Sequence, residues 1–137
     1  MMVMMTRVEW DDEEHTILRF DLAKGHTWAE YHAAVLTLVE MSKQTSGRVD
    51  VIINNPFGLP PGNPLPELRR TVPVYSTITN LGLVIAINSR RLPGFIESLI
   101  KIATQVVGIA EDRSEFVNTL DEARQRIREH RKQSAQA

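Results

Sequence analysis

The sequence predicts one α/β domain with a mostly parallel sheet of four to five strands, an antiparallel N-terminal hairpin at one edge, and helices packed against the sheet. Residues 49–53 and 81–87 are apolar runs rich in β-branched side chains, which is typical of parallel strands buried on both faces. The apolar residues of 28–42 recur every three or four positions, as in a helix with one buried side. Segments 6–10 and 16–22 flank an acidic turn, and the second alternates with a period of two, as in a hairpin.

The length and composition of the chain limit its organisation. At 137 residues it has the commonest size of one domain, so we expect a single domain over 1–133 and a frayed tail at 134–137. Its 16 basic and 17 acidic side chains give a net charge of −1, which provides no overall field to attract nucleic acid or anionic lipid. The chain has no cysteine, and its apolar residues 1–5 are too few for a signal peptide or a membrane span. We therefore expect a cytoplasmic protein.

The first helix has a predicted beginning and end. Thr27-Trp28-Ala29-Glu30 is a capping box, in which Thr27 accepts a hydrogen bond from the Glu30 amide and the Glu30 carboxylate reaches back to the Thr27 amide. We expect the helix to end near Thr45 to Gly47, with Gly47 as a left-handed cap. The predicted buried stripe consists of Trp28, Tyr31, Val35, Leu38, Val39 and Ser42.

Proline, asparagine and threonine delimit the later helices. Asn63 is a candidate N-cap with Pro64 at the first helical position, and we expect Pro73 to stop this helix. Apolar spacing predicts a long helix from Pro93 to about Ala110, the alternative being a break near Thr104 with a strand over 105–109.

The C-terminal segment contains a second capping box, Thr119-Leu120-Asp121-Glu122. It predicts a strand over 115–118 and a terminal helix that carries Leu120, Ala123 and Ile127 on its apolar side. Glu122 is spaced for an ion pair with Arg126, and the remaining basic side chains of the helix complement its dipole.

Candidate binding residues follow the two buried strands. Asn54 and Asn55 begin the proline-rich loop 54–63, and the other strand is followed by Asn88, Ser89, Arg90 and Arg91. Open α/β sheets bind ligands at this edge, and amide and guanidinium groups near helix N-termini suit a small anion. Phe57, Gly58 and Leu59 belong to the same loop, where the two apolar side chains either anchor a partner or fold back over the sheet.

The sequence offers little chemistry for catalysis. No hydroxyl residue occurs between Ser46 and Thr71, and the loop has no His, Asp, Glu, Lys or Cys, so it contains no nucleophile or general base. His26 and Glu30 form one candidate pair, but no further ligand is placed to complete a site, and surface positions near a helix start explain both. We therefore expect no metal, no cofactor and no enzymatic activity.

Four local motifs carry a resemblance: Val8-Glu9-Trp10-Asp11-Asp12, Trp28 with Tyr31, Leu81-Gly82-Leu83-Val84, and the final Thr-Leu-Asp-Glu-Ala-Arg. With the predicted order of elements, they resemble the STAS fold of anti-sigma-factor antagonists, and more closely a small bacterial STAS-like or lipid-transfer-like branch. The resemblance covers almost the whole chain and implies that the loop after the central strand faces a ligand or partner. Family antagonists carry Asp-Ser there, and phosphorylation of the serine switches off binding. Asn54 and Asn55 hold these places here, so the phosphorylation switch does not transfer.

The expected function is that of a non-enzymatic binding or regulatory module similar to STAS domains. We expect it to recognise a protein partner through the loop 54–63 and the following helix, with Arg69 and Arg70 exposed. A symmetric homodimer is a further expectation, because exposed apolar patches on small domains often meet a second copy. The alternative is a carrier of a small apolar, lipid-like ligand, with a pocket between a helix over 94–110 and the sheet. Neither nucleic acid nor a membrane is an expected partner.

Overall fold

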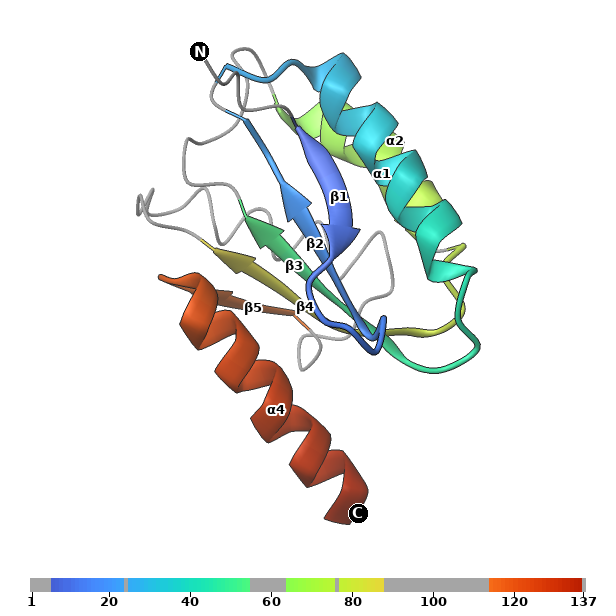
Figure 1. Ribbon diagram of the computed structural model, residues 1–137. Coiled ribbons are helices and arrows are strands. Elements are labelled where there is room, and N and C mark those ends of the chain that lie inside the picture. The colour runs from blue at the N-terminus through green and yellow to red at the C-terminus, as the bar shows by residue number, and fades with distance from the viewer. Residues whose placement is uncertain (1–5, 24, 55–63, 76, 88–113, 137) are drawn as a thin grey trace.

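The computed structural model of the chain describes residues 6–23, 25–54, 64–75, 77–87 and 114–136. In chain order, their elements are β1 (Arg7–Trp10), β2 (Ile17–Asp21), α1 (Trp28–Ser42), β3 (Val49–Asn54), α2 (Pro64–Tyr75), β4 (Leu81–Ile87), β5 (Ser114–Val117) and α4 (Leu120–Gln136). Figure 1 shows them as one α/β arrangement of helices around a twisted sheet. The predicted long helix from Pro93 and its alternative strand lie outside the described residues.

The described residues form a sheet of five strands in the order β1-β2-β3-β4-β5. β1 pairs antiparallel with β2, and every other neighbouring pair is parallel. The prediction of a mostly parallel sheet with an antiparallel N-terminal edge is therefore confirmed. β3 lies in the middle, so 49–53, one of the two segments that we expected to be buried on both faces, forms the central strand.

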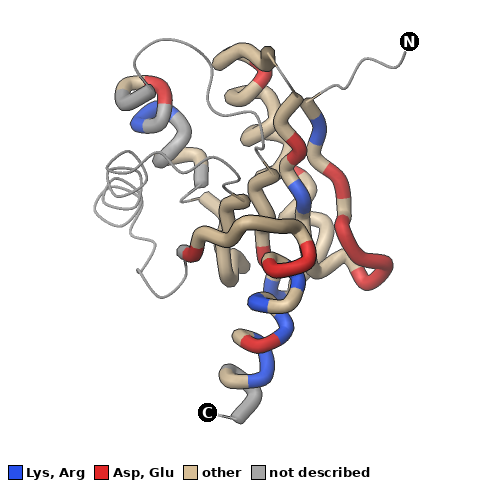
Figure 2. The backbone as a smooth tube through the Cα atoms, turned by 90° about the vertical axis from the view of Figure 1, so that its left-hand side faces the viewer, with Lys and Arg blue, Asp and Glu red and all other residues tan. Residues whose placement is uncertain are grey.

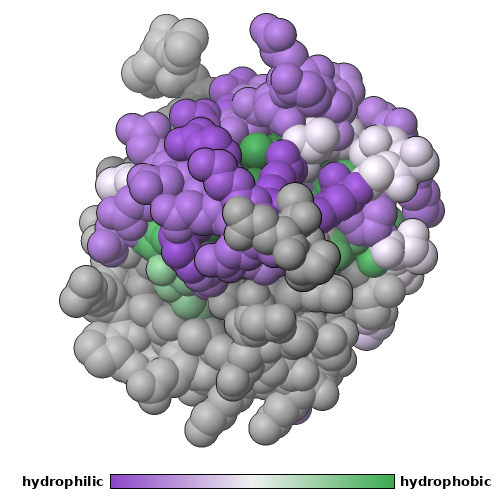
Figure 3. Space-filling model, turned by 90° about the horizontal axis from the view of Figure 1, so that it is seen from below, coloured by the Kyte–Doolittle hydropathy of each residue, from purple (hydrophilic) through white to green (hydrophobic). Residues whose placement is uncertain are grey.

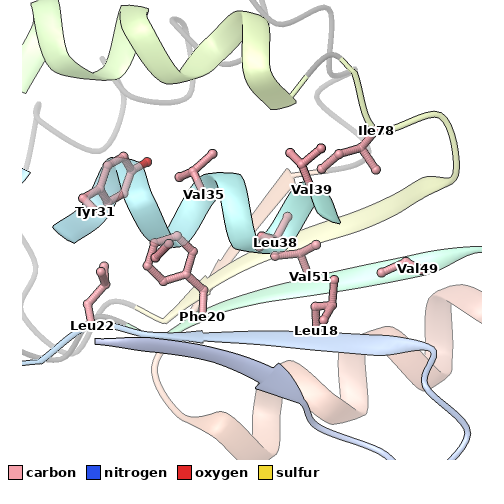
Figure 4. Close-up of a cluster of buried hydrophobic side chains, with 11 residues drawn as sticks. Leu18, Phe20, Leu22, Tyr31, Val35, Leu38, Val39, Val49, Val51 and Ile78 are labelled. Atoms are coloured by element: carbon pink, nitrogen blue, oxygen red, sulfur yellow. The ribbon is translucent and has the colours of Figure 1, made fainter. Parts of the chain in front are cut away.

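Two apolar clusters fill the space on either face of the sheet. On one face, the buried stripe of α1, which includes Val35 and Leu38, packs against Leu18, Phe20 and Val51 (Figure 4). On the other face, α4 supplies a smaller apolar surface, Ala123 and Ile127, which packs against strand residues Ile52, Leu83, Ile85 and Ile87. The sheet therefore lies between α1 with α2 on one side and α4 on the other (Figure 1).

Helix α1 begins as predicted but ends earlier. The Thr27 side chain accepts a hydrogen bond from the Glu30 amide at 3.1 Å, which caps the first turn. The helix ends at Ser42, and Gly47 does not adopt the left-handed conformation that we predicted. The side-chain amide of Asn80, from the turn before β4, instead donates to the carbonyls of Ser42, Thr45 and Gly47. A distant side chain thus replaces the local glycine cap.

Helix α2 continues past the proline that we expected to stop it. Pro64 is its first residue, as predicted, but the helix runs through Pro73 to Tyr75. Proline lacks one N–H and therefore removes one hydrogen bond of the helical ladder. Because Pro73 lies in the last turn, this loss does not end the helix.

Helix α4 has the predicted start but different ion pairs. The Glu122 amide donates to Thr119 Oγ1 at 3.1 Å, and the Glu122 carboxylate accepts from the Asn118 amide at 3.2 Å. Glu122 is therefore engaged at the cap and does not form the ion pair that we predicted with Arg126. Arg126 binds Glu115 of β5 and, at 2.8 Å, Glu129. The helix continues to Gln136, into the segment expected as a tail.

Candidate functional site

The carboxyl edge of the parallel strands carries one of the predicted site residues, Asn54. Its side-chain amide donates to Asp21 at the end of β2 at 2.9 Å, and Asp21 also accepts from Arg19 Nε at 2.9 Å. Asn54 thus ties β3 to β2, and its amide N–H is engaged within the fold. The other predicted residues of this edge, Asn55, Phe57, Gly58, Leu59, Asn88, Ser89, Arg90 and Arg91, lie outside the described residues, as does the helix over 94–110 expected to line an apolar pocket.

The two other described candidates, Arg69 and Arg70, are exposed on α2 as predicted. The Arg70 side chain is 71% exposed and lies 3.7 Å from Glu67, one turn earlier on the same helix. Glu67 in turn binds His32 Nε2 of α1 at 2.5 Å. This contact between helices fixes α2 beside α1 (Figure 1).

One large apolar side chain of the described residues is exposed, Leu36 of α1, at 57%. It follows His32 by four positions and therefore lies on the same flank of α1, the flank that faces α2. We group Leu36 with the two exposed arginines of α2 as one candidate surface, which we call the α1–α2 seam, defined by Leu36, Arg69 and Arg70.

The start of α1 holds two buried polar groups. His26 is only 4% exposed, so the predicted surface position is wrong for this residue. Its Nδ1 lies 2.8 Å from the Ala23 carbonyl, which can only accept, so Nδ1 carries the proton in this contact. His26 Nε2 and Trp28 Nε1 are buried, and neither has a hydrogen-bond partner among the residues that the structure describes. The Trp28 ring also packs edge-on against Tyr31, with ring centroids 5.4 Å apart.

An ionic network covers the β1–β2 part of the sheet face on the α4 side. Arg19 binds Glu9, Asp11 and Asp21, and Asp11 also accepts two hydrogen bonds of 2.8 Å from Arg124 of α4. Burial alone would raise the pKa of the Asp11 carboxyl, but the hydrogen bonds from Arg124 and Arg19 outweigh it and lower that pKa below its ordinary value of 3.8. Arg124 therefore has a specific partner, Asp11, whereas the sequence analysis explains the basic side chains of this helix by the helix dipole alone.

The hairpin turn between β1 and β2 is acidic and lies at one margin of the molecule (Figure 2). Its Asp12 accepts hydrogen bonds from the Thr16 hydroxyl and from the amides of Thr16 and Ile17. Burial acts to raise the pKa of the Asp12 carboxyl, but these hydrogen bonds lower it below 3.8 overall. Asp12 is thus a structural cap of the turn.

A second ionic cluster surrounds Asp50 of β3, which is completely buried. One carboxylate oxygen accepts from the Leu83 amide at 2.7 Å and from Arg48 Nε at 2.9 Å, and the other accepts from Arg131 Nε of α4 at 2.8 Å. Arg48 also contacts His130 Nδ1 at 2.8 Å. These charges lie at the lower end of the sheet, where the described surface seen from below is mainly hydrophilic (Figure 3). They bind α4 to the sheet.

Gly82 makes room for this cluster. The register of β3 and β4 shifts between Val49 and Val51, so Gly82 lies at a bulge opposite Asp50. A β-carbon at Gly82 would overlap the Arg48 guanidinium and the Asp50 carboxylate. A glycine inside an apolar strand is a sequence signal for such a close approach, and it could have indicated that a polar group lies here.

The described residues contain no group of three or more His, Cys, Asp or Glu side chains arranged to hold a metal ion. Across the same ranges, no helix is both long and apolar enough to span a membrane. Comparison of the chain with protein-family models, curated proteins and solved structures found no match. The resemblance to STAS domains therefore stays a prediction from sequence motifs.

Proposed function

We propose that the chain is a non-enzymatic protein-binding module of the STAS-like kind, and that the α1–α2 seam is its recognition surface. The observation that carries the proposal is the exposure of Leu36 on α1 together with that of two arginines on the neighbouring helix α2. The recognition role predicted for the loop 54–63, which precedes α2 in the chain, stays part of the proposal.

The composition of the seam resembles the centre of a protein interface. An apolar anchor next to arginine is the combination that contributes most binding free energy in such interfaces. α1 and α2 both connect parallel strands, so they run in the same direction. Leu36 and Arg70 each lie one turn beyond the contact between His32 and Glu67, which brings them to the same level of the two helices. That contact holds both helices in place before a partner arrives, which reduces the entropy lost on binding.

The charged groups of the sheet support binding rather than catalysis. The carboxylates of Asp11, Asp12, Asp21 and Asp50 are each held by arginine, amide or hydroxyl donors of the fold. A general base needs a lone pair directed at substrate, whereas these lone pairs stabilise the protein itself. The expected partner presents an apolar side chain with acidic neighbours, which complements Leu36 and the α2 arginines.

Affinity capture with matched variants tests the proposal. The wild-type chain, Leu36→Ser, and the double variant Arg69→Glu with Arg70→Glu are immobilised and exposed to an extract of the source cells. The control is Arg128→Glu with Lys132→Glu, which makes the same charge change at exposed positions of α4. The protein retained by the wild type is then purified and titrated against each variant by calorimetry. We expect both seam variants to bind at least about ten-fold more weakly and the control to bind as the wild type does. Equal affinity for all four chains would refute the seam as the recognition surface.

A further inference from the structure

Strand β1 is the first strand of the sheet, and half of its backbone hydrogen-bonding groups point away from the neighbouring strand β2. In β2, the Thr16 carbonyl accepts from Asp50 and the Leu22 amide donates to Asn54, so the even-numbered residues of this strand bond to β3. The odd-numbered residues therefore bond to β1, as the hydrogen bond from the Asp11 amide to the Ile17 carbonyl at 2.8 Å confirms.

This alternation determines which backbone groups of β1 point outward, away from β2. Val8 and Trp10 are paired with Phe20 and Leu18, which bond to β3, so the N–H and C=O groups of Val8 and Trp10 point outward. None of the described residues hydrogen-bonds to these outward groups. An edge strand with unpaired groups is a template for one more strand.

The charges of β1 favour one occupant and one register. Arg7 and Glu9 lie on the same face of the strand, and their side chains are 66% and 40% exposed. If a second copy pairs antiparallel with Val8 opposite its own Val8, Arg7 of each copy lies opposite Glu9 of the other. A shift of two residues in one direction places Arg7 opposite Arg7, and a shift in the other places Glu9 opposite Glu9. Opposite charges across a strand pair stabilise it and like charges destabilise it, so only the first register is favoured.

We propose that the protein forms a symmetric homodimer through the outer edge of β1, with the two-fold axis at Val8, so that two five-stranded sheets become one continuous sheet. This interface is separate from the α1–α2 seam and does not depend on the proposed function. In the monomer, Arg7 lies 3.7 Å from Glu9 of its own chain at the surface, a weak contact that the dimer replaces by two cross-strand pairs. In an antiparallel sheet, these pairs belong to the closer, non-hydrogen-bonded positions. Since β1 has only four residues, we expect a weak dimer, with a Kd on the order of 0.1 mM.

Sedimentation velocity of the full chain from about 10 µM to about 1 mM measures the association. Amide hydrogen exchange at both concentrations locates it. We expect the Val8 and Trp10 amides to become protected as concentration rises, while the amides of Arg7 and Glu9, which bond to β2, are protected throughout. A monomer at the highest concentration, or a dimer without concentration-dependent protection at Val8, would overturn the proposal.

A pair of charge variants gives an independent test of the register. Arg7→Glu and Glu9→Lys each place like charges across the two-fold axis, so each alone should associate about ten-fold more weakly than wild type. An equimolar mixture of the two restores both cross-strand pairs and should form a heterodimer of wild-type affinity. Lys43→Glu, at a side chain of 62% exposure directly after α1, is the control and should not affect association. Failure of the mixture to associate more tightly than either variant alone would contradict the register. If Glu9→Lys does not fold, the Arg7→Glu variant and the exchange measurement still decide the case.

Discussion

Replacement of Asp50 by alanine should destabilise the protein more than any surface substitution, because this carboxylate joins three parts of the fold. It accepts from Arg48 directly before its own strand, from the Leu83 amide at the bulge of β4, and from Arg131 of α4. Asp50→Ala leaves the Leu83 N–H buried without an acceptor and leaves two guanidinium groups without their anion.

The size of the effect follows from the burial of each group. A buried, unsatisfied amide costs about 1 to 3 kcal/mol of stability, and loss of one member of a buried ion pair costs about 3 to 5 kcal/mol. The Arg48 and Arg131 side chains are 32% and 34% exposed and can regain water, which reduces the second figure. We therefore expect a loss of about 3 kcal/mol in the free energy of unfolding, a large share of the roughly 5 to 15 kcal/mol of a typical domain.

Urea denaturation measures this loss. The midpoint should fall by about 1 to 3 M with an unchanged slope, since the surface exposed on unfolding stays the same. Asp50→Asn keeps an acceptor for the Leu83 amide and should lose about half as much. Glu14→Ala, at an exposed position of the hairpin turn, is the control and should change stability by less than about 0.5 kcal/mol. A loss below about 1 kcal/mol for Asp50→Ala would refute the view that this cluster holds α4 on the sheet.

Two further predictions concern the ionic contacts of the sheet, one around Asp50 and the other around Asp11. Gly82→Ala should lower the free energy of unfolding, measured by urea denaturation, by about 1 to 3 kcal/mol, because the added β-carbon overlaps Arg48 and Asp50. Gly47→Ala is the control and should not lose stability, because the nearest atom to its β-carbon would be 4.0 Å away. Equal effects of the two substitutions would contradict the close approach at Gly82. The lowered pKa of Asp11 means that the unfolded chain binds this proton more readily, so its contribution to stability is complete above about pH 5 and is lost as the pH falls through 3.8 and below. Asp11→Asn should therefore flatten the acid limb of a plot of unfolding free energy against pH, and an unchanged limb would show that its ion pairs are unimportant.

The elements that local patterns specify could be predicted from the sequence. In the run 49–53, every residue except Asp50 is apolar. This run forms the central strand of the sheet, and helices cover both of its faces. The capping box at Thr27 is equally local, since donor and acceptor are three residues apart. In both cases the information lies within a few neighbouring residues, so the position of the element follows from them.

The features that depend on distant partners could not be predicted. Asn80 ends α1 from 38 residues away by donating to the Ser42 carbonyl, and no local pattern distinguishes it from an ordinary turn asparagine. Arg124 and Asp11 are separated by 113 residues, so their contact requires the register of α4 on the sheet. The prediction for Glu122 was wrong for another reason, because a partner equally near in sequence, the Asn118 amide, engages its carboxylate.

The candidate site divides in the same way. The exposure of Arg69 and Arg70 was predicted, whereas the exposure of Leu36 on the neighbouring helix α1 was not. Leu36 is not part of the buried stripe that the sequence predicts for α1. An apolar residue outside such a stripe is a signal that could have indicated the exposure of Leu36.

The ionic network around Arg19 links the interior of the sheet to its outer edge. Arg19 is largely buried and binds Glu9, Asp11 and Asp21 together, so the Glu9 carboxylate is held in a fixed position on β1. A charge that is already ordered loses little entropy when a second chain approaches, which favours pairing with an exposed Arg7. The substitution Arg19→Met removes the guanidinium group that holds Glu9. It should therefore weaken the dimer, even though residue 19 does not lie at the outer edge of β1. A dimer of unchanged affinity in this variant would mean that the backbone groups of β1, and not the ordered charge of Glu9, determine its association.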